Sequence, residues 1–172
     1  MRLHPRFLCV FSLALAMLAP FPAVAEPTAI YLVRHGEKVA GKDPELSAEG
    51  QARAQNIATI LQRAGITSIF SSPTMRTRQT AQPLAQRSSV AVQTYDPAAP
   101  KALVERVKAQ SGAVLVVGHS NTLPELVRLF GGAPGTDIAD NEYDRLYQLI
   151  IAANGAVSTV LLTSLPATGP AP

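Results

Sequence analysis

The chain has 172 residues, of which 47% are hydrophobic and 16% are charged, and its formal net charge is +3. This composition excludes a disordered polar chain, and the length suits one domain with short appendages. There is one cysteine in the whole chain, which excludes an intrachain disulfide.

The first 25 residues predict a secretory signal peptide. Arg2 and Arg6 form a positively charged start, an apolar run covers residues 7–19, and Ala23-Val24-Ala25 offers a small-x-small cleavage site. The apolar run is shorter than the roughly 20 residues of a transmembrane helix. We therefore expect cleavage after Ala25 and export, rather than a core helix or an uncleaved anchor at this position.

Cleavage there removes two of the 15 basic residues and none of the 12 acidic ones, so the net charge falls to about +1. A nucleic-acid partner is not expected at that charge. Cys9 is also removed, which excludes a thiol nucleophile and a thiolate metal site. An exported chain without disulfides suggests a bacterial periplasm, and we expect no stable membrane insertion after cleavage.

Residues 26–163 alternate predicted strands and helices in chain order and form one expected domain. Apolar, β-branched runs indicate strands at 28–34, 67–71, 90–95, 113–117, 145–152 and 157–162. Helical spacing and capping residues indicate helices at 47–65, 73–87 with a break at Pro83, 100–110 and 121–130. Asn154-Gly155 predicts a hairpin between the last two strands, and 164–172 is expected to be a flexible tail.

This order predicts an α/β fold of three layers, α/β/α, with a central, mostly parallel sheet and an antiparallel C-terminal strand pair. Ligands in such sheets bind beyond the carboxyl ends of the strands. The search for chemistry therefore begins at the residues that follow each strand.

Both histidines beyond the signal segment directly follow a predicted strand. His35 stands in the run RHGE at 34–37, and His119 stands in the run GHSN at 118–121. Each histidine has a glycine beside it, which lets the backbone turn sharply or approach a ligand closely. The sequence thus predicts two imidazoles at one edge of the sheet.

Arginines accompany these histidines. Arg34 ends the first strand, and Arg76 and Arg78 lie on the helix that follows the second strand. Guanidinium groups bind phosphate oxygens in a bidentate manner, and an imidazole can attack phosphorus to form a phosphohistidine. The combination predicts a site for phosphoryl transfer.

Four segments together resemble the histidine phosphatase superfamily, in its phosphoglycerate mutase-like branch. RHG at 34–36 is similar to the nucleophile motif, and DPELSAEG at 43–50 is similar to the D-x-x-L-[ST]-x-x-G segment. SPTMRTRQTA at 72–81 resembles the S-P-x-x-R-[AT]-x-Q-T-A segment, and GHS at 118–120 matches the second-histidine motif. The resemblance covers residues 29–132.

The resemblance implies that His35 is the nucleophile and that Arg34, Arg76 and His119 hold the phosphoryl group. Arg78 falls at a variable position of its motif, and on a helix it points about 200° away from Arg76. Neighbours of the two histidines are expected to contact substrate, namely Gly36, Glu37, Ser120 and Asn121. Asn121 has the alternative role of capping the helix that follows.

The chain departs from the family pattern in two places. Gly41 stands where many mutase-type members have asparagine, and the usual glutamate proton donor has no clear counterpart. Asp96 follows a strand and is our candidate acid, with Glu37 and Glu105 as the alternatives. The segment between the second arginine and the second histidine leaves little room for the family's cap insertion.

Three other interpretations remain open. The segment GHSNT at 118–122 resembles a serine-hydrolase elbow, but Thr122 replaces the final glycine. His35, Glu37 and His119 could ligate a metal, although neighbouring arginines would repel the cation. A phosphate- or polyanion-binding protein of the same fold would keep the pocket and lack the acid.

We therefore expect a histidine phosphatase that hydrolyses a phosphomonoester or related phosphoryl compound through a phosphohistidine intermediate. No cofactor or metal is expected, and the expected partner is a small phosphorylated substrate. A mutase is disfavoured because it would need a closed cap. The smallest capless members of the family include phosphohistidine phosphatases.

Overall fold

The computed structural model describes residues 27–168, so the expected signal peptide lies outside the described residues. Six strands form one sheet in the order β3-β2-β4-β1-β5-β6. The strands are β1 (Pro27–Arg34), β2 (Ile66–Ser71), β3 (Val92–Thr94), β4 (Gly112–Gly118), β5 (Arg145–Ile151) and β6 (Val157–Thr163). The helices are α1 (Ala48–Leu61), α2 (Met75–Ser88), α3 (Pro100–Lys108) and α4 (Leu123–Leu129).

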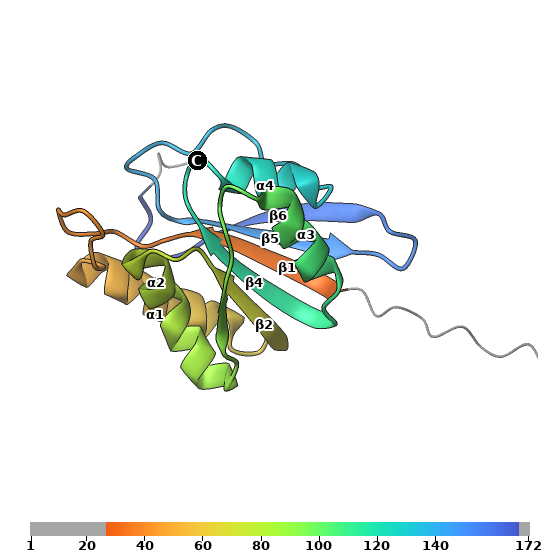
Figure 1. Ribbon diagram of the computed structural model, residues 1–172, viewed down its shortest axis with the longest axis horizontal. Coiled ribbons are helices and arrows are strands. Elements are labelled where there is room, and N and C mark those ends of the chain that lie inside the picture. Colours follow the sequence, from red (N-terminus) through yellow and green to blue (C-terminus); the bar gives the residue numbers. More distant parts are fainter. Residues whose placement is uncertain (1–26, 169–172) are drawn as a thin grey trace, which may run out of the picture.

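The sheet is parallel from β3 to β1, while β5 pairs antiparallel with both β1 and β6. Helices α1 and α2 cover one face, and α3 and α4 cover the other (Figure 1). The expected three-layer fold with an antiparallel C-terminal pair is confirmed. Consequently the carboxyl ends of β1, β2 and β4 meet at one edge of the sheet.

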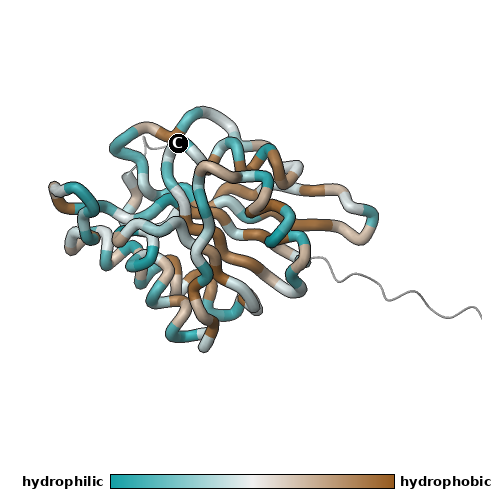
Figure 2. The backbone as a smooth tube through the Cα atoms, viewed as in Figure 1, coloured by the Kyte–Doolittle hydropathy of each residue, from teal (hydrophilic) through white to brown (hydrophobic). Residues whose placement is uncertain are grey.

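Successive residues of the central strands serve opposite cores. In β4, Val114 and Val116 pack with α3 and α4, whereas Leu115 and Val117 pack with α1 and α2. The apolar segments accordingly run through the middle of the molecule (Figure 2). Two packed faces hold β1 and β4 rigidly, and these strands carry the two histidines at their ends.

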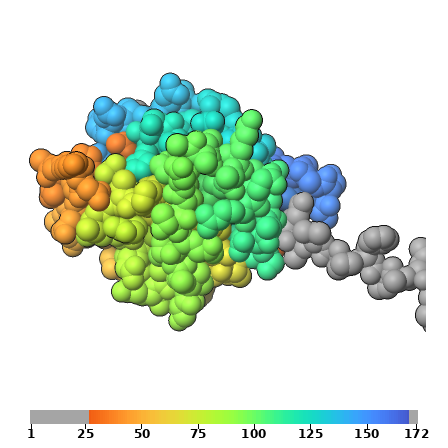
Figure 3. Space-filling view, viewed as in Figure 1, coloured from red at the N-terminus to blue at the C-terminus, as the bar shows by residue number. Residues whose placement is uncertain are grey.

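Helix α2 differs from the expectation in its first residue and in its continuity at Pro83. It begins at Met75 rather than Pro73, and it continues through Pro83 without the expected break. A proline removes one backbone hydrogen bond from a helix. Ala81, Leu84 and Ala85 are buried on either side of Pro83, so packing against the sheet holds the helix together. In the space-filling view, the yellow-green and green segments that include α2 and α3 form the centre of the visible face (Figure 3).

Strand β3 and helix α4 are shorter than expected. Strand β3 covers only Val92–Thr94 of the expected 90–95, and these three residues pair with the last three residues of β2. The segment after His119 forms a turn before α4, because the backbone N–H groups of Thr122 and Leu123 both donate to the carbonyl of His119. The helix therefore begins two residues later than the sequence indicated.

The end of the described chain is anchored, in contrast to the expected tail from Ser164. Ser164 is buried, and its N–H donates to the carbonyl of Asp144 at 2.8 Å. The N–H of Leu165 donates to Asn56 Oδ1, and that of Thr168 to Asp144 Oδ2. The ordered domain thus extends at least to Thr168.

Within residues 27–168, no helix has both the length and the apolarity to cross a bilayer.

Candidate active site

The two histidines lie side by side because β1 and β4 are neighbours. Arg34 is in register with Gly118, and the N–H of His35 donates to the Gly118 carbonyl at 3.0 Å. The imidazole centroids of His35 and His119 are 5.4 Å apart, with the rings inclined at 66°. The pairing of the strands thus sets the distance between the two rings.

His35 is oriented by its own backbone neighbour. Its Nδ1 lies 2.7 Å from the carbonyl oxygen of Gly36, so Nδ1 carries the proton and donates it. The other nitrogen, Nε2, then holds a lone pair. Burial lowers the pKa of His35 to about 3, with smaller contributions from His119, Arg34 and Arg76. The ring is therefore neutral and nucleophilic at pH 7.

Gly36 is required for packing, because its backbone lies against helix α1. A Cβ at Gly36 would lie 2.8 Å from the Gly50 carbonyl oxygen, and a Cβ at Gly50 would lie 2.0 Å from that of Glu37. The loop after β1 therefore sits directly on the first turn of α1. The N–H of Gly36 donates to Thr80 Oγ1, and its carbonyl accepts from His35. These contacts use both backbone polar groups of Gly36, so its expected role in substrate binding has no support in the geometry.

His119 is held by the residue that follows strand β2. Its Nε2 lies 2.8 Å from Ser72 Oγ, and its backbone N–H donates to Thr122 Oγ1. Burial, followed by the charges of Arg76 and Arg34, lowers the pKa of His119 to about 4. A dianionic phosphoryl group between these residues would favour protonation of His119 again.

Arg76 faces the histidines and Arg78 does not. Arg76 lines the same cavity as His35 and His119, and its buried Nε has no hydrogen-bond partner. Its Nη1 lies 3.7 Å from Asp43 Oδ1, and the same oxygen accepts from the N–H of Met75. Arg78 is exposed. Of the two arginines, the structure therefore brings Arg76 to the site.

Arg34 is buried behind the histidines. Its Nη1 donates to the carbonyls of Ala139 and Glu142, at 2.9 and 2.7 Å, and its guanidinium lies 4.0 Å from the centre of the Tyr143 ring. Its Nε is buried without a partner, as is that of Arg76. Two buried, unpartnered N–H donors beside neutral imidazoles suit an anion.

His35, His119 and Arg76 line a cavity of about 350 Å³, which we call the phosphate cavity, whereas Arg34 lies outside its lining. Its lining residues come from the position after β1, from α2, from the segment after β3 and from the turn after β4. They are His35, Arg76, Pro97, His119, Ser120, Asn121 and Thr122. The expected contacts Ser120 and Asn121 thus lie at the site.

None of the three candidate acids lines the phosphate cavity. Asp96 Oδ1 accepts from the N–H of Ala98, so the carboxylate closes its own turn. Glu37 binds Arg53 through both oxygens, at 2.6 and 3.0 Å. Glu105 is exposed on α3. The expected roles of Asp96 as acid and Glu37 as substrate contact therefore have no support in the geometry.

A metal site at His35, Glu37 and His119 is equally unsupported. The Glu37 carboxylate is turned toward Arg53, whose side chain is fully buried. Within the described part of the chain, no three histidine, cysteine, aspartate or glutamate side chains come together as potential metal ligands.

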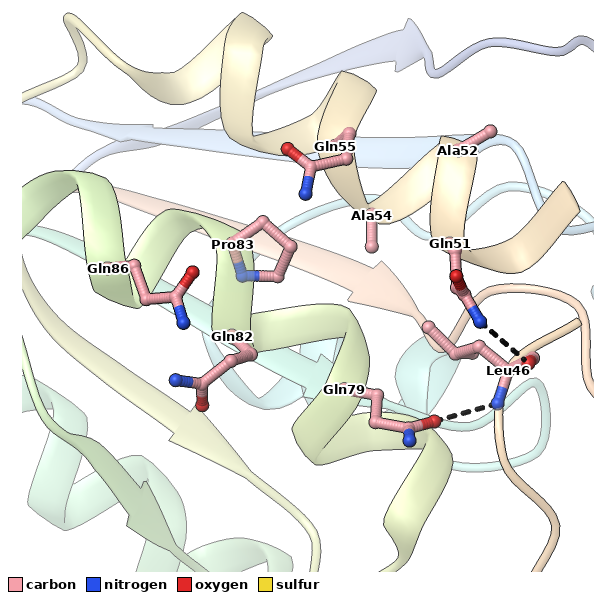
Figure 4. A pocket seen from close by; sticks show the side chains of 9 residues that line it. All are labelled: Leu46, Gln51, Ala52, Ala54, Gln55, Gln79, Gln82, Pro83 and Gln86. Atoms are coloured by element: carbon pink, nitrogen blue, oxygen red, sulfur yellow. Dashed lines mark hydrogen bonds between the residues drawn. The ribbon is translucent and has the colours of Figure 1, made fainter. Parts of the chain in front are cut away.

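A separate cavity of about 420 Å³ lies between α1 and α2 and carries no charged side chain. Glutamines from both helices face it, and Leu46 hydrogen-bonds to Gln51 and Gln79 (Figure 4). The remaining lining residues are Ala52, Ala54, Gln55, Gln82, Pro83 and Gln86. Without a charge to neutralise an anion, this cavity does not suit a phosphoryl group.

Several residues that build the site were not identified from the sequence. Ser72 and Thr80 orient the two histidine segments, Tyr143 covers Arg34, and Arg53 binds Glu37. Ser72 stands inside the segment 72–81 that resembles the family, which is a signal for its importance. Tyr143 lies in a loop without a motif, and no signal in the sequence marks it.

Comparison with known proteins agrees with this architecture. Residues 30–97 match the family model described as histidine phosphatase superfamily (branch 1). This stretch holds the segments of His35 and Arg76, and the motif resemblance is thereby confirmed. Over these residues the chain is similar to this superfamily.

Among curated proteins, the chain is similar to "Probable phosphoglycerate mutase GpmB" of Escherichia coli. The two are 43% identical over 65 residues, which are 33% of this chain and 30% of the relative. The match thus spans less than a third of the length of that relative.

Solved structures share the fold over more of the chain. The protein histidine phosphatase SixA complexed with tungstate is 18% identical, with a TM-score of 0.63, over 79% of this chain and 96% of that one. The mycobacterial glucosyl-3-phosphoglycerate phosphatase is 16% identical, with a TM-score of 0.55, over 80% and 98%. At these identities the likeness concerns the fold alone.

Proposed function

We propose that this protein is a phosphatase that hydrolyses a phosphomonoester through a phosphohistidine formed at His35. One observation carries the proposal. The neutral imidazole of His35, held by Gly36 with Nε2 free, lies beside His119 and Arg76 in one cavity, and the buried Nε of Arg76 lacks a hydrogen-bond partner.

In the first step, the Nε2 lone pair of His35 forms a bond to phosphorus while the bond to the ester oxygen breaks. The leaving oxygen keeps the bonding electrons and takes a proton from water. Arg76 and Arg34 neutralise the charge on the phosphoryl oxygens. The Nδ1–H bond to Gly36 stabilises the positive charge that develops on the ring.

In the second step, a water oxygen bonds to phosphorus and the N–P bond breaks, returning its electrons to Nε2. The water proton passes to solvent, and inorganic phosphate leaves. The sum of both steps is the conversion of one ester and one water into one alcohol and one phosphate. His35 ends in its starting state, as a catalyst must.

The lining of the phosphate cavity bears on the choice of leaving group. None of its residues is a carboxylate, so no side chain of that type delivers a proton to the departing oxygen. Esters with acidic leaving groups, such as p-nitrophenyl phosphate, should therefore react much faster than simple alkyl esters. The same observation favours one alternative, a phosphate- or polyanion-binding protein of this fold without turnover.

Mutase activity is not part of the proposal. Only residues 95–99 join β3 to α3, so no cap segment is inserted there to retain a phosphorylated intermediate. We also propose export to the periplasm, which rests on the pattern of residues 1–25 described above.

The test is turnover of p-nitrophenyl phosphate by the wild-type protein and by His35→Ala. We expect the variant to fold and to retain less than about a hundredth of the activity. Rapid quenching of the wild type in alkali should trap an acid-labile phosphoryl group that His35→Ala lacks. Arg78→Ala, an exposed change on α2, serves as the control.

Two results would count against the proposal. If His35→Ala retains most of the activity, the nucleophile lies elsewhere. If the wild type binds phosphate or vanadate but turns over no substrate, the binding-protein alternative replaces the phosphatase.

A further inference from the structure

The loop before β5 wraps the guanidinium of Arg34, the residue that directly precedes His35. Nη1 of Arg34 donates to the carbonyl oxygens of Ala139 and Glu142. The ring of Tyr143, the next residue of the same loop, lies 4.0 Å from the guanidinium. Burial lowers the pKa of Arg34, so the surroundings disfavour its charge. The carbonyl oxygens and the aromatic ring offset part of this cost and hold the side chain in one place.

The ring of Tyr143 also reaches His35. Its centre lies 6.0 Å from the centre of the His35 imidazole, and the two ring planes are inclined at 58°. Tyr143 makes its contacts with Arg34 and His35 through the ring rather than through the hydroxyl. One side chain therefore limits the movement of two consecutive residues of the site.

Tyr143 is held in turn by residues 164–168, which we call the C-terminal segment. The backbone N–H of Tyr143 donates to Thr168 Oγ1 at 2.8 Å. The N–H of Thr168 donates to Oδ2 of Asp144, and the N–H of Ser164 donates to the carbonyl of Asp144, both at 2.8 Å. These hydrogen bonds fix the backbone at Tyr143 and at the residue that follows it.

Resting on the proposed function, we propose that Tyr143 is a positioning residue, which the C-terminal segment holds against Arg34 and His35 through Thr168. Tyr143 does not line the phosphate cavity, so it acts through its two neighbours and not on the substrate. Its ring keeps the imidazole in the orientation from which Nε2 attacks phosphorus. The rate of such a step depends steeply on the placement of the reacting atoms.

Steady-state kinetics with p-nitrophenyl phosphate tests the role of the ring. Tyr143→Leu should lower kcat by about tenfold to a hundredfold, because a small displacement of a reacting group is costly. KM should change less than about twofold, since Arg76 and His119 still line the phosphate cavity. Tyr143→Phe keeps the ring and should restore most of the lost activity. If Tyr143→Phe loses as much as Tyr143→Leu, the hydroxyl acts instead of the ring, and the proposal is overturned.

A double-mutant cycle tests the role of the C-terminal segment. Thr168→Val removes the oxygen that accepts from Tyr143 and should lower kcat, whereas Thr168→Ser keeps this oxygen and should restore kcat. The double variant Tyr143→Leu, Thr168→Val should lose no more than Tyr143→Leu alone, because both changes disturb the same contact. Losses that multiply would show that Thr168 acts independently of Tyr143 and would overturn the proposal.

Thr163→Val, an exposed change on β6, is the matched control and should keep the wild-type kcat. Thr168 is only partly buried, so Thr168→Val carries little risk for folding. An unchanged kcat in Thr168→Val therefore overturns the proposal even if Tyr143→Leu fails to fold.

The wild-type protein separates this proposal from the proposed function. If it turns over p-nitrophenyl phosphate and Tyr143→Leu is equally active, only the positioning role is wrong. If it turns over no ester, the proposed function fails, and proton NMR of the imidazoles tests the contact itself. Thr168→Val should then shift the ring signals of His35 more than those of His119, because the ring of Tyr143 lies beside His35. Unchanged His35 signals would overturn the proposal.

Discussion

Ser72 Oγ lies 2.8 Å from Nε2 of His119, so a residue that follows β2 orients the imidazole that follows β4. Ser72 is fully buried, and its hydroxyl also contacts Thr77 Oγ1 on α2. The orientation of His119 therefore depends on two elements to which it is not joined in sequence.

Ser72→Ala should lower kcat for p-nitrophenyl phosphate by about tenfold to a hundredfold, because His119 loses the contact that sets its ring. The matched control is Ser68→Ala, which removes a buried hydroxyl from the amino-terminal half of β2, where it donates to Gln110. Both variants should unfold at similar urea concentrations. Equal effects on kcat would show that a buried hydroxyl, rather than the orientation of His119, matters.

Arg76→Ala should reduce kcat/KM by about a hundredfold to a thousandfold, as removal of one donor to a developing oxyanion does. Arg78→Ala should change kcat/KM less than about twofold, because Arg78 is exposed outside the phosphate cavity. Steady-state kinetics on both variants provides the measurement. A larger loss for Arg78 would mean that α2 is rotated relative to this structure.

Arg53→Ala should destabilise the protein by about 3–5 kcal/mol. Arg53 is fully buried and joins Glu37, two residues after the nucleophile, to Ser164 near the end of the described chain. Its removal leaves the Glu37 carboxylate without its partner. Urea unfolding measures the loss, with the exposed Arg63→Ala on the segment after α1 as control. A loss below about 1 kcal/mol would contradict this role.

The free energy of unfolding should decrease as the pH falls from about 6.5 to about 4. The pKa values of His35 and His119 are about 3 and about 4 in the folded protein, below the ordinary value of 6.5. In that interval the unfolded chain binds protons that the folded chain does not, so acid favours unfolding. Urea unfolding across this range measures how steeply the free energy of unfolding depends on pH. The dependence should be weaker in the double variant His35→Gln, His119→Gln. An identical dependence would assign the effect to other groups.

Asp96→Asn should have a small effect, and the same effect on alkyl and p-nitrophenyl esters. The carboxylate accepts a hydrogen bond from the N–H of Ala98 and does not line the phosphate cavity. The asparagine oxygen can accept the same bond. A selective loss of alkyl ester hydrolysis would return the role of proton donor to Asp96.

The pattern of residues along the chain is enough to predict the order of strands and helices and the identity of the reacting groups. Apolar runs such as 113–117 have one stable position, at the centre of a covered sheet. Residues directly after such strands must reach the same edge, so the sequence pattern alone places His35 and His119 together. The choice between the arginines follows from helical geometry, which separates Arg76 from Arg78.

The directions of the carboxylates, in contrast, depend on contacts between segments that are distant in sequence. Glu37 is two residues from His35, yet its side chain binds Arg53, which α1 brings beside it. Asp96 stands at the expected edge and turns back to its own loop. In the same way, Ser72, Thr80 and Tyr143 reach the site from separate segments. A side chain on a loop bonds to whichever group packing brings within hydrogen-bond distance. The neighbouring residues in the sequence do not indicate which group that will be.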